Sequence, residues 1–230
     1  YNAENNSHIN PYSDVCYYYI EIGSENGLRM SAANQPSGNP STSFTTFHDY
    51  KFFEKDEYNI GQIGRRWFGH RFYFENTRSF NFDFPNLITS SPLKLKVYVA
   101  ASAESATNME IKANNSDVSN LSLASVEYGI LGTEAVFNGD IGSSSDAVTI
   151  DLFYNNNGNP SARAYLDYIS LEAERALVAS ALQFQFKHND TPLLSGVGQF
   201  NISSATGINE VWDVTDPYNT TYYRNELNSA

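Results

Sequence analysis

The sequence predicts an all-β protein that consists of a jelly-roll β-sandwich and a small second β subdomain. Composition is the first observation, because aromatic residues make up 14% and hydrophobic residues 41% of the 230 residues. Aromatic and β-branched side chains favour strands, whereas the abundant Asn, Ser and Gly favour the turns between them. Second, apolar and polar side chains alternate over short segments, which is the period of a half-buried strand. Third, no segment longer than about ten residues has a clear helical period, so little helix is expected.

The first strands are expected within residues 1–36. Residues 14–22 are apolar and aromatic and lie between Pro11 and Gly23, so they predict a strand. Residues 27–30 are a candidate hairpin partner for that strand. A hairpin of this kind buries little surface by itself and needs a further partner.

The sandwich is expected over residues 42–176, after a Pro-, Gly- and Ser-containing linker at 32–45. Residues 79–84 alternate Phe with polar residues, and residues 93–99 alternate Leu or Val with Lys and Tyr. Further strands are predicted at 71–75, 109–112, 118–123, 135–138, 147–154 and 164–173. The Asn- and Gly-rich residues 155–160 predict a tight connection, because both residue types tolerate positive φ. Many short strands at this spacing are typical of a jelly roll, here of the galactose-binding-like kind.

After Arg175 the strand pattern restarts. Strand candidates separated by turn residues lie at 181–187, 197–203 and 210–214. Three such strands form a thin sheet by themselves. We therefore expect segment 177–230 to pair with the strands of segment 1–36 in one small sheet, with the jelly roll inserted between them.

Charge and cysteine content limit the function and the location of the chain. The net charge of −12 and the pI of about 4.6 repel a phosphate backbone, so no nucleic-acid partner is expected. A single cysteine excludes an intrachain disulfide, which is compatible with a bacterial surface protein. No apolar run approaches the roughly 20 residues that cross a bilayer. The chain opens at Tyr1 without Met, which we interpret as a fragment of a longer, exported protein.

No catalytic residue is expected in this chain. Cys16 is the sharpest candidate, since a thiolate beside a histidine is an activated nucleophile. However, Cys16 shares strand parity with Tyr18 and Ile20, and unpaired cysteine is usually buried, so a structural role is favoured. The four histidines show no metal-ligand spacing, and surface or capping roles are expected for them: His8, His48, His70 and His188.

Two groups of acidic residues are candidate sites. Oxygen ligands for Ca²⁺ could come from Asp140, Asp146, Asp151, Asp167 and residues 155–159. No EF-hand pattern is present, so a structural calcium ion is possible and no other cofactor is expected. The second group, Glu54, Asp56 and Glu57, lies beside Lys51 and Lys55 and predicts a solvated, locally paired loop.

A basic ridge is the candidate site for ligand binding or domain docking. It comprises Arg65, Arg66, Trp67, His70 and Arg71, in an otherwise acidic chain. Arginine among aromatics can bind phosphate or carboxylate, or stack on a sugar ring. The favoured alternative is that Trp67 and Phe68 anchor the loop in the core, while the arginines either extend along the surface to water or meet acids of a neighbouring domain.

A carbohydrate-binding or adhesion module is the alternative function. Trp212, Tyr222 and Tyr223 could form a platform for a sugar, although aromatics at sheet edges more often belong to a core. This alternative requires exposed aromatic faces. It loses its support if Trp67, Trp212 and Tyr222 are all buried.

Several motifs along the chain are similar to those of one known family. They are Asn-Pro-Tyr-Ser-Asp at 10–14, the acidic-aromatic stretch at 48–59, Gly-Arg-Arg-Trp-Phe-Gly at 64–69, Tyr-Leu-Asp-Tyr-Ile at 165–169, and Val-Trp-Asp-Val-Thr-Asp at 211–216. In order and spacing, from about His8 to Tyr218, they resemble the region upstream of the peptidase domain in PorU-like sortases. These are gingipain-related cysteine peptidases of the type IX secretion system in Bacteroidetes.

The resemblance implies a parent protein that is a cysteine endopeptidase on the cell surface, associated with the outer membrane. It would remove C-terminal sorting signals from type IX secretion cargo and attach the cargo to anionic lipopolysaccharide. Neither catalytic residue of the family falls in this chain, because Gly69-His70-Arg71 replaces Gly-His-Gly and Cys16 lies in an aromatic run. The peptidase domain is expected beyond Ala230, and this chain would be its non-catalytic accessory region. The implied partners are that domain, other secretion components and cargo proteins.

Overall fold

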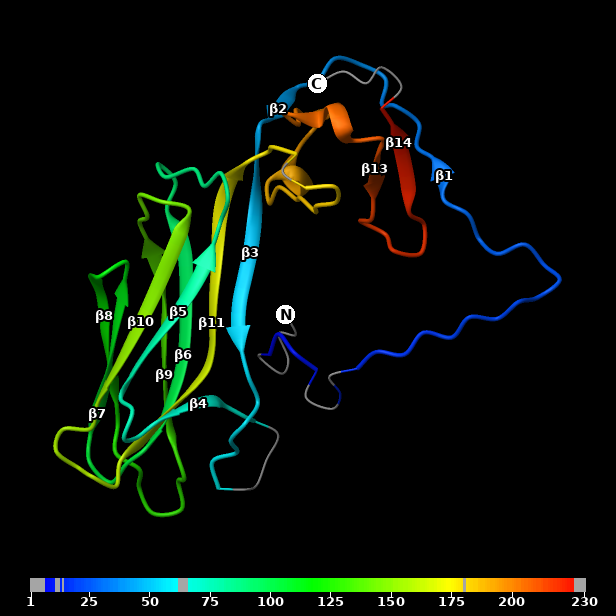
Figure 1. The fold of residues 1–230 in the computed structure, drawn as a ribbon. Helices are drawn as coiled ribbons and strands as arrows, with labels where there is room; N and C mark the ends of the chain where they lie inside the picture. The colour runs from blue at the N-terminus through cyan, green and yellow to red at the C-terminus, as the bar shows by residue number, and fades with distance from the viewer. Residues whose placement is uncertain (1–6, 11–12, 14, 62–65, 180, 226–230) are drawn as a thin grey trace. The chain divides into compact units, whose positions relative to one another are not determined.

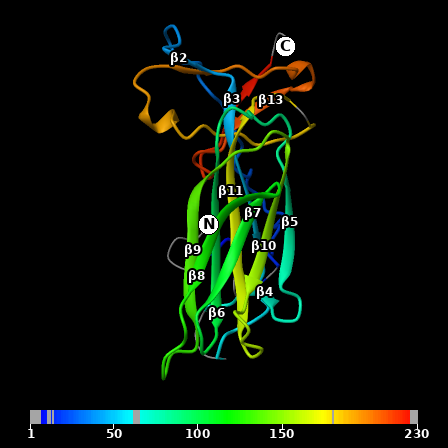
Figure 2. The ribbon, with the colours of Figure 1, turned by 90° about the vertical axis from the view of Figure 1, so that its left-hand side faces the viewer.

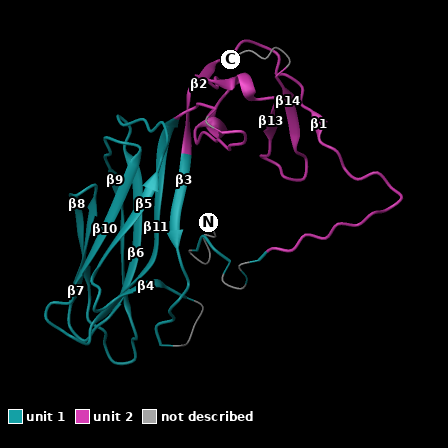
Figure 3. Ribbon diagram, viewed as in Figure 1, with its two compact units in different colours: residues 1–15, 49–175 teal, residues 16–48, 176–230 magenta. Residues whose placement is uncertain are grey.

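The computed structural model confirms the all-β fold class. It describes residues 7–10, 13, 15–61, 66–179 and 181–225. Within them the only helices are two short 3₁₀ turns, Thr191–Leu193 and Ala205–Gly207, and strands dominate the remainder. The chain divides into two compact units (Figure 3): unit 1 is Tyr1–Val15 with Asp49–Arg175, and unit 2 is Cys16–His48 with Ala176–Ala230.

Unit 1 contains an antiparallel four-stranded sheet. Its strands are β5 (Thr77–Asp83), β10 (Ala147–Asn155), β7 (Thr107–Ala113) and β8 (Ser116–Leu123), in that spatial order. They lie side by side in Figure 2. The β7–β8 hairpin turns at Asn114 and Asn115, which both have positive φ, as a tight two-residue hairpin turn requires.

A five-stranded sheet forms the second layer (Figure 1). The order is β3 (Thr46–Glu54), β11 (Arg163–Ala176), β6 (Leu93–Ser102) and β9 (Thr133–Ile141), and β4 (Gly69–Phe72) also pairs with β11. The first long strand, β3, therefore lies beside the last, β11. From β3 to β11 the chain crosses repeatedly between the two sheets, which is the connectivity of a jelly roll.

The core lies between the two sheets of unit 1. Both alternating segments behave as predicted: Phe80 and Phe82 of β5 and Leu95 and Val97 of β6 are buried, and their polar neighbours face outward. The other buried strand residues include Met109, Ile111, Ile150, Leu152, Leu166 and Ile169. The predicted turn at 155–160 also forms with positive φ, at Asn157 and Gly158.

Unit 2 contains two small sheets. In one, β1 (Ser31–Ala32) pairs in parallel with β14 (Thr221–Arg224), which pairs with β13 (Glu210–Asp213). In the other, β2 (Thr42–Phe44) pairs in parallel with β12 (Gly198–Phe200). Segments from before and after the jelly roll therefore share sheets within this unit.

Three predicted segments differ from the structure. The described residues of 14–22 form no strand, and neither do residues 27–30 or 181–187. Strand propensity is realised only where another strand satisfies the backbone, and none of these segments has a partner strand within the described residues. Cys16 is consequently exposed and does not pack in a core.

Candidate functional site

The basic ridge begins with an arginine that is held by its own sheet. Arg65 lies outside the described residues. The Arg66 guanidinium pairs with the Asp167 carboxylate, and its Nη1 donates to Glu134 Oε1 and to the Tyr98 hydroxyl at 3.0 Å each. The guanidinium carbon also lies 4.0 Å from the centroid of the Tyr98 ring. The acids that meet Arg66 thus come from β11 and β9 of the same module, and not from a neighbouring domain.

A β-bulge places the carboxylate that binds Arg66. Against β6, the register of β11 shifts between Leu166 and Tyr168, so Asp167 is the extra residue. A bulge redirects a side chain that regular pleating would aim elsewhere. Burial raises the pKa of Asp167 to about 6, although its hydrogen bond and ion pair with Arg66 oppose that rise. The same pair holds the pKa of Arg66 above its usual range, against the effect of burial.

The two aromatic residues of the ridge have different environments. Phe68 is buried against Ala100 and Tyr165, and its backbone exchanges hydrogen bonds of 2.7 Å with Tyr58. Trp67 is 42% exposed. Phe68 therefore anchors the loop as expected, whereas Trp67 presents its indole at the surface.

The last part of the ridge forms β4. A Cβ on Gly69 would lie 2.8 Å from Lys55 Cβ and 2.9 Å from the Lys55 carbonyl oxygen, so only glycine allows this close approach. The His70 ring stacks on Phe53, with centroids 5.2 Å apart and planes 9° from parallel. Burial, followed by the charges of Lys55 and Arg78, lowers the pKa of His70 and so disfavours its protonated form. Arg71 is exposed above the Tyr58 ring.

The ridge is therefore not one continuous patch. Arg66 belongs to a network on the outer face of the five-stranded sheet, and His70 turns into a groove between the sheets. Trp67 and Arg71 are the two described members whose side chains are exposed. Docking through these residues stays a prediction.

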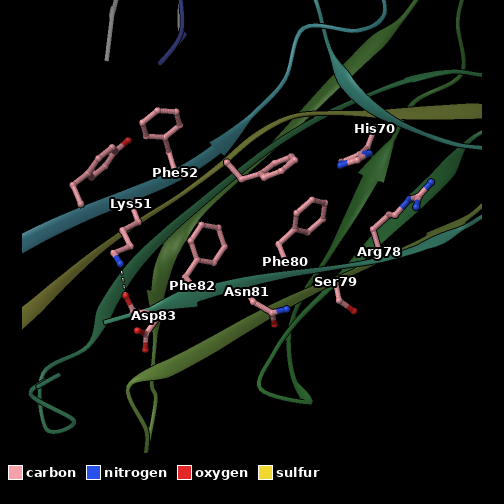
Figure 4. A pocket seen from close by; sticks show the side chains of 11 residues that line it. Lys51, Phe52, His70, Arg78, Ser79, Phe80, Asn81, Phe82 and Asp83 are labelled. Atoms are coloured by element: carbon pink, nitrogen blue, oxygen red, sulfur yellow. Dashed lines mark hydrogen bonds between the residues drawn. The ribbon is translucent and has the colours of Figure 1, made fainter. Parts of the chain in front are cut away.

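The groove that receives His70 lies between β3 and β5 (Figure 4). Its volume is about 810 Å³, and its floor is aromatic. Phe53 of β3 lies 4.7 Å from Phe80 of β5, centroid to centroid, and Phe82 continues the same row. The inward-facing sides of the two strands thus meet here.

Cationic side chains lie at both ends of this floor. In Figure 4, Lys51 lies at one end, and Arg78 lies at the other end beside the uncharged His70 ring. Lys51 Nζ donates to the Asp83 backbone carbonyl, and Arg78 pairs with Glu75. The Arg78 Nε is buried and has no hydrogen-bond partner among the described residues.

Sequence reasoning missed most of this groove. The alternation of Phe at 79–84 showed a half-buried strand, but not that β5 lies at a sheet edge facing β3. The pairing order decides this, and pairing order is not visible in a single sequence. Arg78 preceding an alternating Phe run was the one available signal.

Cys16 and the histidines lie in separate environments in the described residues. No hydrogen bond or ring contact joins Cys16 to a histidine there. His8 instead contacts Glu54 Oε2 through Nδ1 at 2.7 Å and the Tyr50 hydroxyl through Nε2 at 2.6 Å. Burial alone would raise the pKa of Glu54, but hydrogen bonds from His8 and Ser7 outweigh it and lower that pKa.

Acidic side chains take local roles in the described structure. Asp146 accepts hydrogen bonds from the backbone amides of Asn86 and Leu87, at 3.0 and 3.1 Å. Lys55 and Glu57 pair at 3.4 Å, as the sequence suggested. No group of three or more His, Cys, Asp or Glu side chains gathers around a possible metal position in the described ranges. A structural calcium ion stays a prediction.

An aromatic pair lies on the small sheet of unit 2. Trp212 of β13 is directly opposite Tyr222 of β14, and the indole is 51% exposed. Its Nε1 donates to Glu210 at 3.1 Å, and the Arg224 guanidinium lies 5.2 Å from the Tyr222 ring centroid. Tyr222 and Tyr223 are half-buried. The three aromatics required by the carbohydrate alternative are therefore not all buried.

The strand order and the two compact units define the class of fold: a jelly-roll sandwich together with a small second β unit. A solved structure of dimeric latent PorU from Porphyromonas gingivalis is similar, with a TM-score of 0.71 and 18% identity. The match covers 85% of this chain and 19% of that chain, so this chain spans about a fifth of the similar protein's length. At this identity the similarity establishes a shared fold.

Other similar structures match more weakly. A CBM36-1 domain of a multidomain xylanase, from the hindgut metagenome of Trinervitermes trinervoides, has a TM-score of 0.37 and 14% identity over 54% of this chain and 96% of that one. A carbohydrate-binding module CBM36 in complex with calcium and xylotriose has a TM-score of 0.36 and 17% identity, over 54% of this chain and 98% of that one. No family model matches the sequence, and neither does any curated protein. No helix in the described ranges is long and apolar enough to cross a membrane.

Proposed function

We propose that this chain is a non-catalytic accessory region of a surface sortase-type cysteine endopeptidase. In this proposal the parent enzyme removes C-terminal sorting signals from type IX secretion cargo and attaches the cargo to anionic lipopolysaccharide. The accessory region positions, shields or guides substrate for a peptidase domain that follows segment 177–230. The parent lies outside the cytoplasm, at the cell surface and associated with the outer membrane. Its partners are the peptidase domain, other secretion components and cargo.

The observation that carries this proposal is the fold similarity to PorU along 85% of the chain. It includes both the jelly roll and residues on either side of it, so it reaches beyond a common sandwich module. The ordered motifs from residue 10 to residue 216 support the same assignment from the sequence.

The gene of the parent protein provides the first test. We expect a Gly-His-Gly stretch downstream of Ala230, followed by a cysteine at a strand-to-helix turn. In the host, in-frame deletion of residues 42–176 should leave cargo that retains its C-terminal signal on immunoblots. A Cys-to-Ala variant of the peptidase domain is the control for complete loss. A stop codon after Ala230, or only further β modules, would contradict the proposal.

A separate experiment tests whether the peptidase domain docks on the basic ridge. Hydrogen exchange and solvent labelling of Trp67 should decrease when the chain is joined to the downstream domain. Arg71→Ala should weaken that protection, because Arg71 is exposed beside the same loop. Equal exposure of Trp67 with and without the downstream domain would count against docking through the ridge.

A carbohydrate-binding or adhesion module is a second candidate function. The observation in its favour is the exposed Trp212 directly opposite Tyr222, since such a pair can stack on a sugar ring. Affinity electrophoresis in surface polysaccharides should then show retardation that Trp212→Ala abolishes. Unretarded migration of the wild-type chain in every polysaccharide would exclude this function for the pair.

A further inference from the structure

The segment Ser7–Ile9, which we call the strap, binds a carboxylate at the end of β3 in unit 1. Ser7 Oγ donates to Glu54 Oε1, and the His8 backbone N–H donates to Glu54 Oε2, at 2.6 Å each. The His8 ring adds a third contact, from Nδ1 to Oε2 at 2.7 Å. The exposed fractions of the His8 and Glu54 side chains are only 2% and 1%. A carboxylate this deeply buried is costly without donors, and the strap supplies them.

Aromatic rings surround the His8 imidazole. It lies 4.5 Å from the Phe52 ring, centroid to centroid, with planes 15° from parallel, and 5.7 Å from the Tyr50 ring. Tyr168 of β11 meets the imidazole edge-on at 4.7 Å. The Tyr50 hydroxyl contacts Nε2 at 2.6 Å, so both ring nitrogens have an oxygen partner. These contacts define what we call the imidazole site: Tyr50, Phe52, Glu54 and Tyr168.

The imidazole site selects a flat ring that carries an N–H donor. An ionised carboxylate only accepts hydrogen bonds, so Nδ1 of His8 must donate to Glu54. Burial raises the pKa of Glu54, but the hydrogen bonds from the strap outweigh burial and favour the ionised form. An aliphatic side chain in place of the imidazole would leave a buried oxygen short of a donor. The stacked rings fix the plane in which that donor must lie.

Open volume adjoins the imidazole site. A hollow of about 260 Å³ lies on the same outer face of the five-stranded sheet, and Tyr50 and Tyr168 also line it. Its other lining side chains include Lys96, Asn138 and Ser170. A ligand with its ring in the imidazole site therefore has space and polar partners for the atoms beside the ring.

The strap is separate from the main hydrophobic core. No member of the imidazole site belongs to the large buried cluster between the sheets. Tyr50 and Phe52 are 39% and 44% exposed even with the strap in place. Loss of the His8 ring should therefore leave the sandwich folded.

We propose that the imidazole site binds a histidine side chain of a peptide, and that the strap occupies it as a competing ligand from the same chain. A peptide containing Ser-His would repeat the donors that Ser7 and His8 direct at Glu54. The strap has the advantage of being tethered beside the site, which gives it a high effective concentration. The proposal does not depend on the function proposed above.

Imidazole is the probe for the site in the full chain. In His8→Gly the ring is missing, so imidazole should bind and raise the thermal midpoint in a saturable way. 1-Methylimidazole is the matched probe, because at about pH 8.5 it is uncharged and has no N–H to donate. It should not stabilise His8→Gly. The wild type should need at least about tenfold more imidazole for the same effect, because the strap competes for the site.

Two further variants separate the carboxylate from stacking. His8→Gly/Glu54→Ala should bind imidazole at least about tenfold more weakly, because a hydrogen bond to a charged acceptor is lost. His70→Gly is the matched control. The His70 ring also stacks on a phenylalanine, Phe53, at 5.2 Å, but no carboxylate bonds to it in the described structure. Imidazole should stabilise His70→Gly no more than 1-methylimidazole does.

Calorimetry with a synthetic peptide tests recognition in trans. The peptide Ser-His-Ile-Asn, which is the sequence of residues 7–10, should bind His8→Gly, whereas Ser-Ala-Ile-Asn should not. In the wild type, hydrogen exchange of the His8 backbone amide should quicken as Ser-His-Ile-Asn is added, because the peptide displaces the strap from Glu54.

Three results would overturn the proposal. One is the absence of imidazole and peptide binding to a folded His8→Gly chain. Another is equal stabilisation by imidazole and 1-methylimidazole, which would mean that the site accepts any flat ring. The third is exchange of the His8 amide that stays constant at every peptide concentration, which would make the strap a fixed part of unit 1. This last measurement uses the wild type and decides the matter even if His8→Gly does not fold.

Discussion

At the scale of single residues, the structure concentrates unusual chemistry around one bulge. Asp167 is 3% exposed, and its carboxylate is paired with the guanidinium of Arg66, which lies 101 positions earlier in the chain. A buried carboxylate of this kind is costly unless a cation and hydrogen bonds compensate it. Arg66 therefore acts as an internal counter-ion that fixes the loop after β3. The sequence pattern favours either a solvent-exposed arginine or one paired with acids of a neighbouring domain, and the structure instead pairs Arg66 within its own module.

The raised pKa of Asp167 predicts a pH dependence. Its folded-state pKa of about 6 lies above the ordinary value of 3.8, so the folded state binds this proton more tightly. The stabilisation is fully present below the ordinary pKa and is lost as pH rises through the folded pKa. Relative to Asp167→Asn, the free energy of unfolding of the wild type should fall by about 1–2 kcal/mol between pH 4 and pH 7.

Urea denaturation of both proteins across this pH range checks the prediction. Glu54 has the opposite dependence, since its pKa is lowered and its stabilisation is lost as pH falls. Both proteins retain Glu54, so they differ only in the repulsion between Glu54 and Asp167, which the variant removes. A wild-type-to-variant difference that does not change with pH would mean that Asp167 has its ordinary pKa.

Gly69 gives a second prediction at this scale. Gly69→Ala places a Cβ 2.8 Å from Lys55 Cβ and 2.9 Å from its carbonyl oxygen. The strain should lower the free energy of unfolding by about 1–3 kcal/mol. Gly142→Ala is the matched control, because no heavy atom lies within 4 Å of the added methyl. Equal thermal midpoints for the two variants would show that β4 shifts without cost.

At the scale of elements, pairing determines which predicted strands form. The strands predicted from the alternation at 79–84 and 93–99 correspond to β5 and β6. They were predictable because the order of apolar and polar side chains along the sequence matches the alternating burial along a strand. Residues 16–22 have equal or stronger strand propensity, yet they lie exposed and unpaired in the described structure. Propensity is local, whereas a ladder needs a partner that one sequence does not identify.

The β6 alternation predicts a face-dependent effect of mutation. Leu95 is fully buried, and Leu95→Ala should cost about 2–5 kcal/mol of unfolding free energy. Lys94 is the adjacent residue on the opposite face, and its ion pair with Glu172 is exposed. Lys94→Ala should therefore change stability by no more than about 1 kcal/mol. Similar losses in the two variants would contradict the inward and outward assignment of β6.

The candidate site was predictable only in part, for the same reason. The basic ridge could be identified from the sequence, but its members lie in three different environments. Arg66 pairs with Asp167, Trp67 is exposed at the surface, and His70 stacks on Phe53. Two of these environments depend on long-range events: the bulge at Asp167 and the edge position of β5. Such events follow from the register of distant strands, which local patterns do not encode.

At the scale of the whole molecule, the main core is self-contained. Every residue of the large hydrophobic cluster falls between Phe72 and Ala173, within unit 1. A domain with its own core can in principle fold alone. We therefore keep the proposal that residues 42–176 are a jelly-roll domain, with segments 1–36 and 177–230 forming the second β subdomain.

A fragment of residues 42–176 tests this division. We expect it to unfold in one cooperative transition by near-ultraviolet circular dichroism and calorimetry, because it contains the whole cluster. Leu95→Ala in the fragment should lower its stability by the same amount as in the full chain, since distant sites add independently. A fragment with a broad, non-cooperative transition would show that the core needs the flanking segments.

The position of β3 beside β11 also bears on the order in which the molecule is made and folded. In the described sheet, the ladder neighbour of β3 is β11, which begins more than one hundred residues later. Closing that pair costs the entropy of the entire intervening loop, and such non-local pairings fold slowly. A growing chain therefore cannot complete this sandwich on the ribosome until the residues of β11 have emerged. Until then, β3 lacks its ladder partner and the five-stranded sheet stays incomplete.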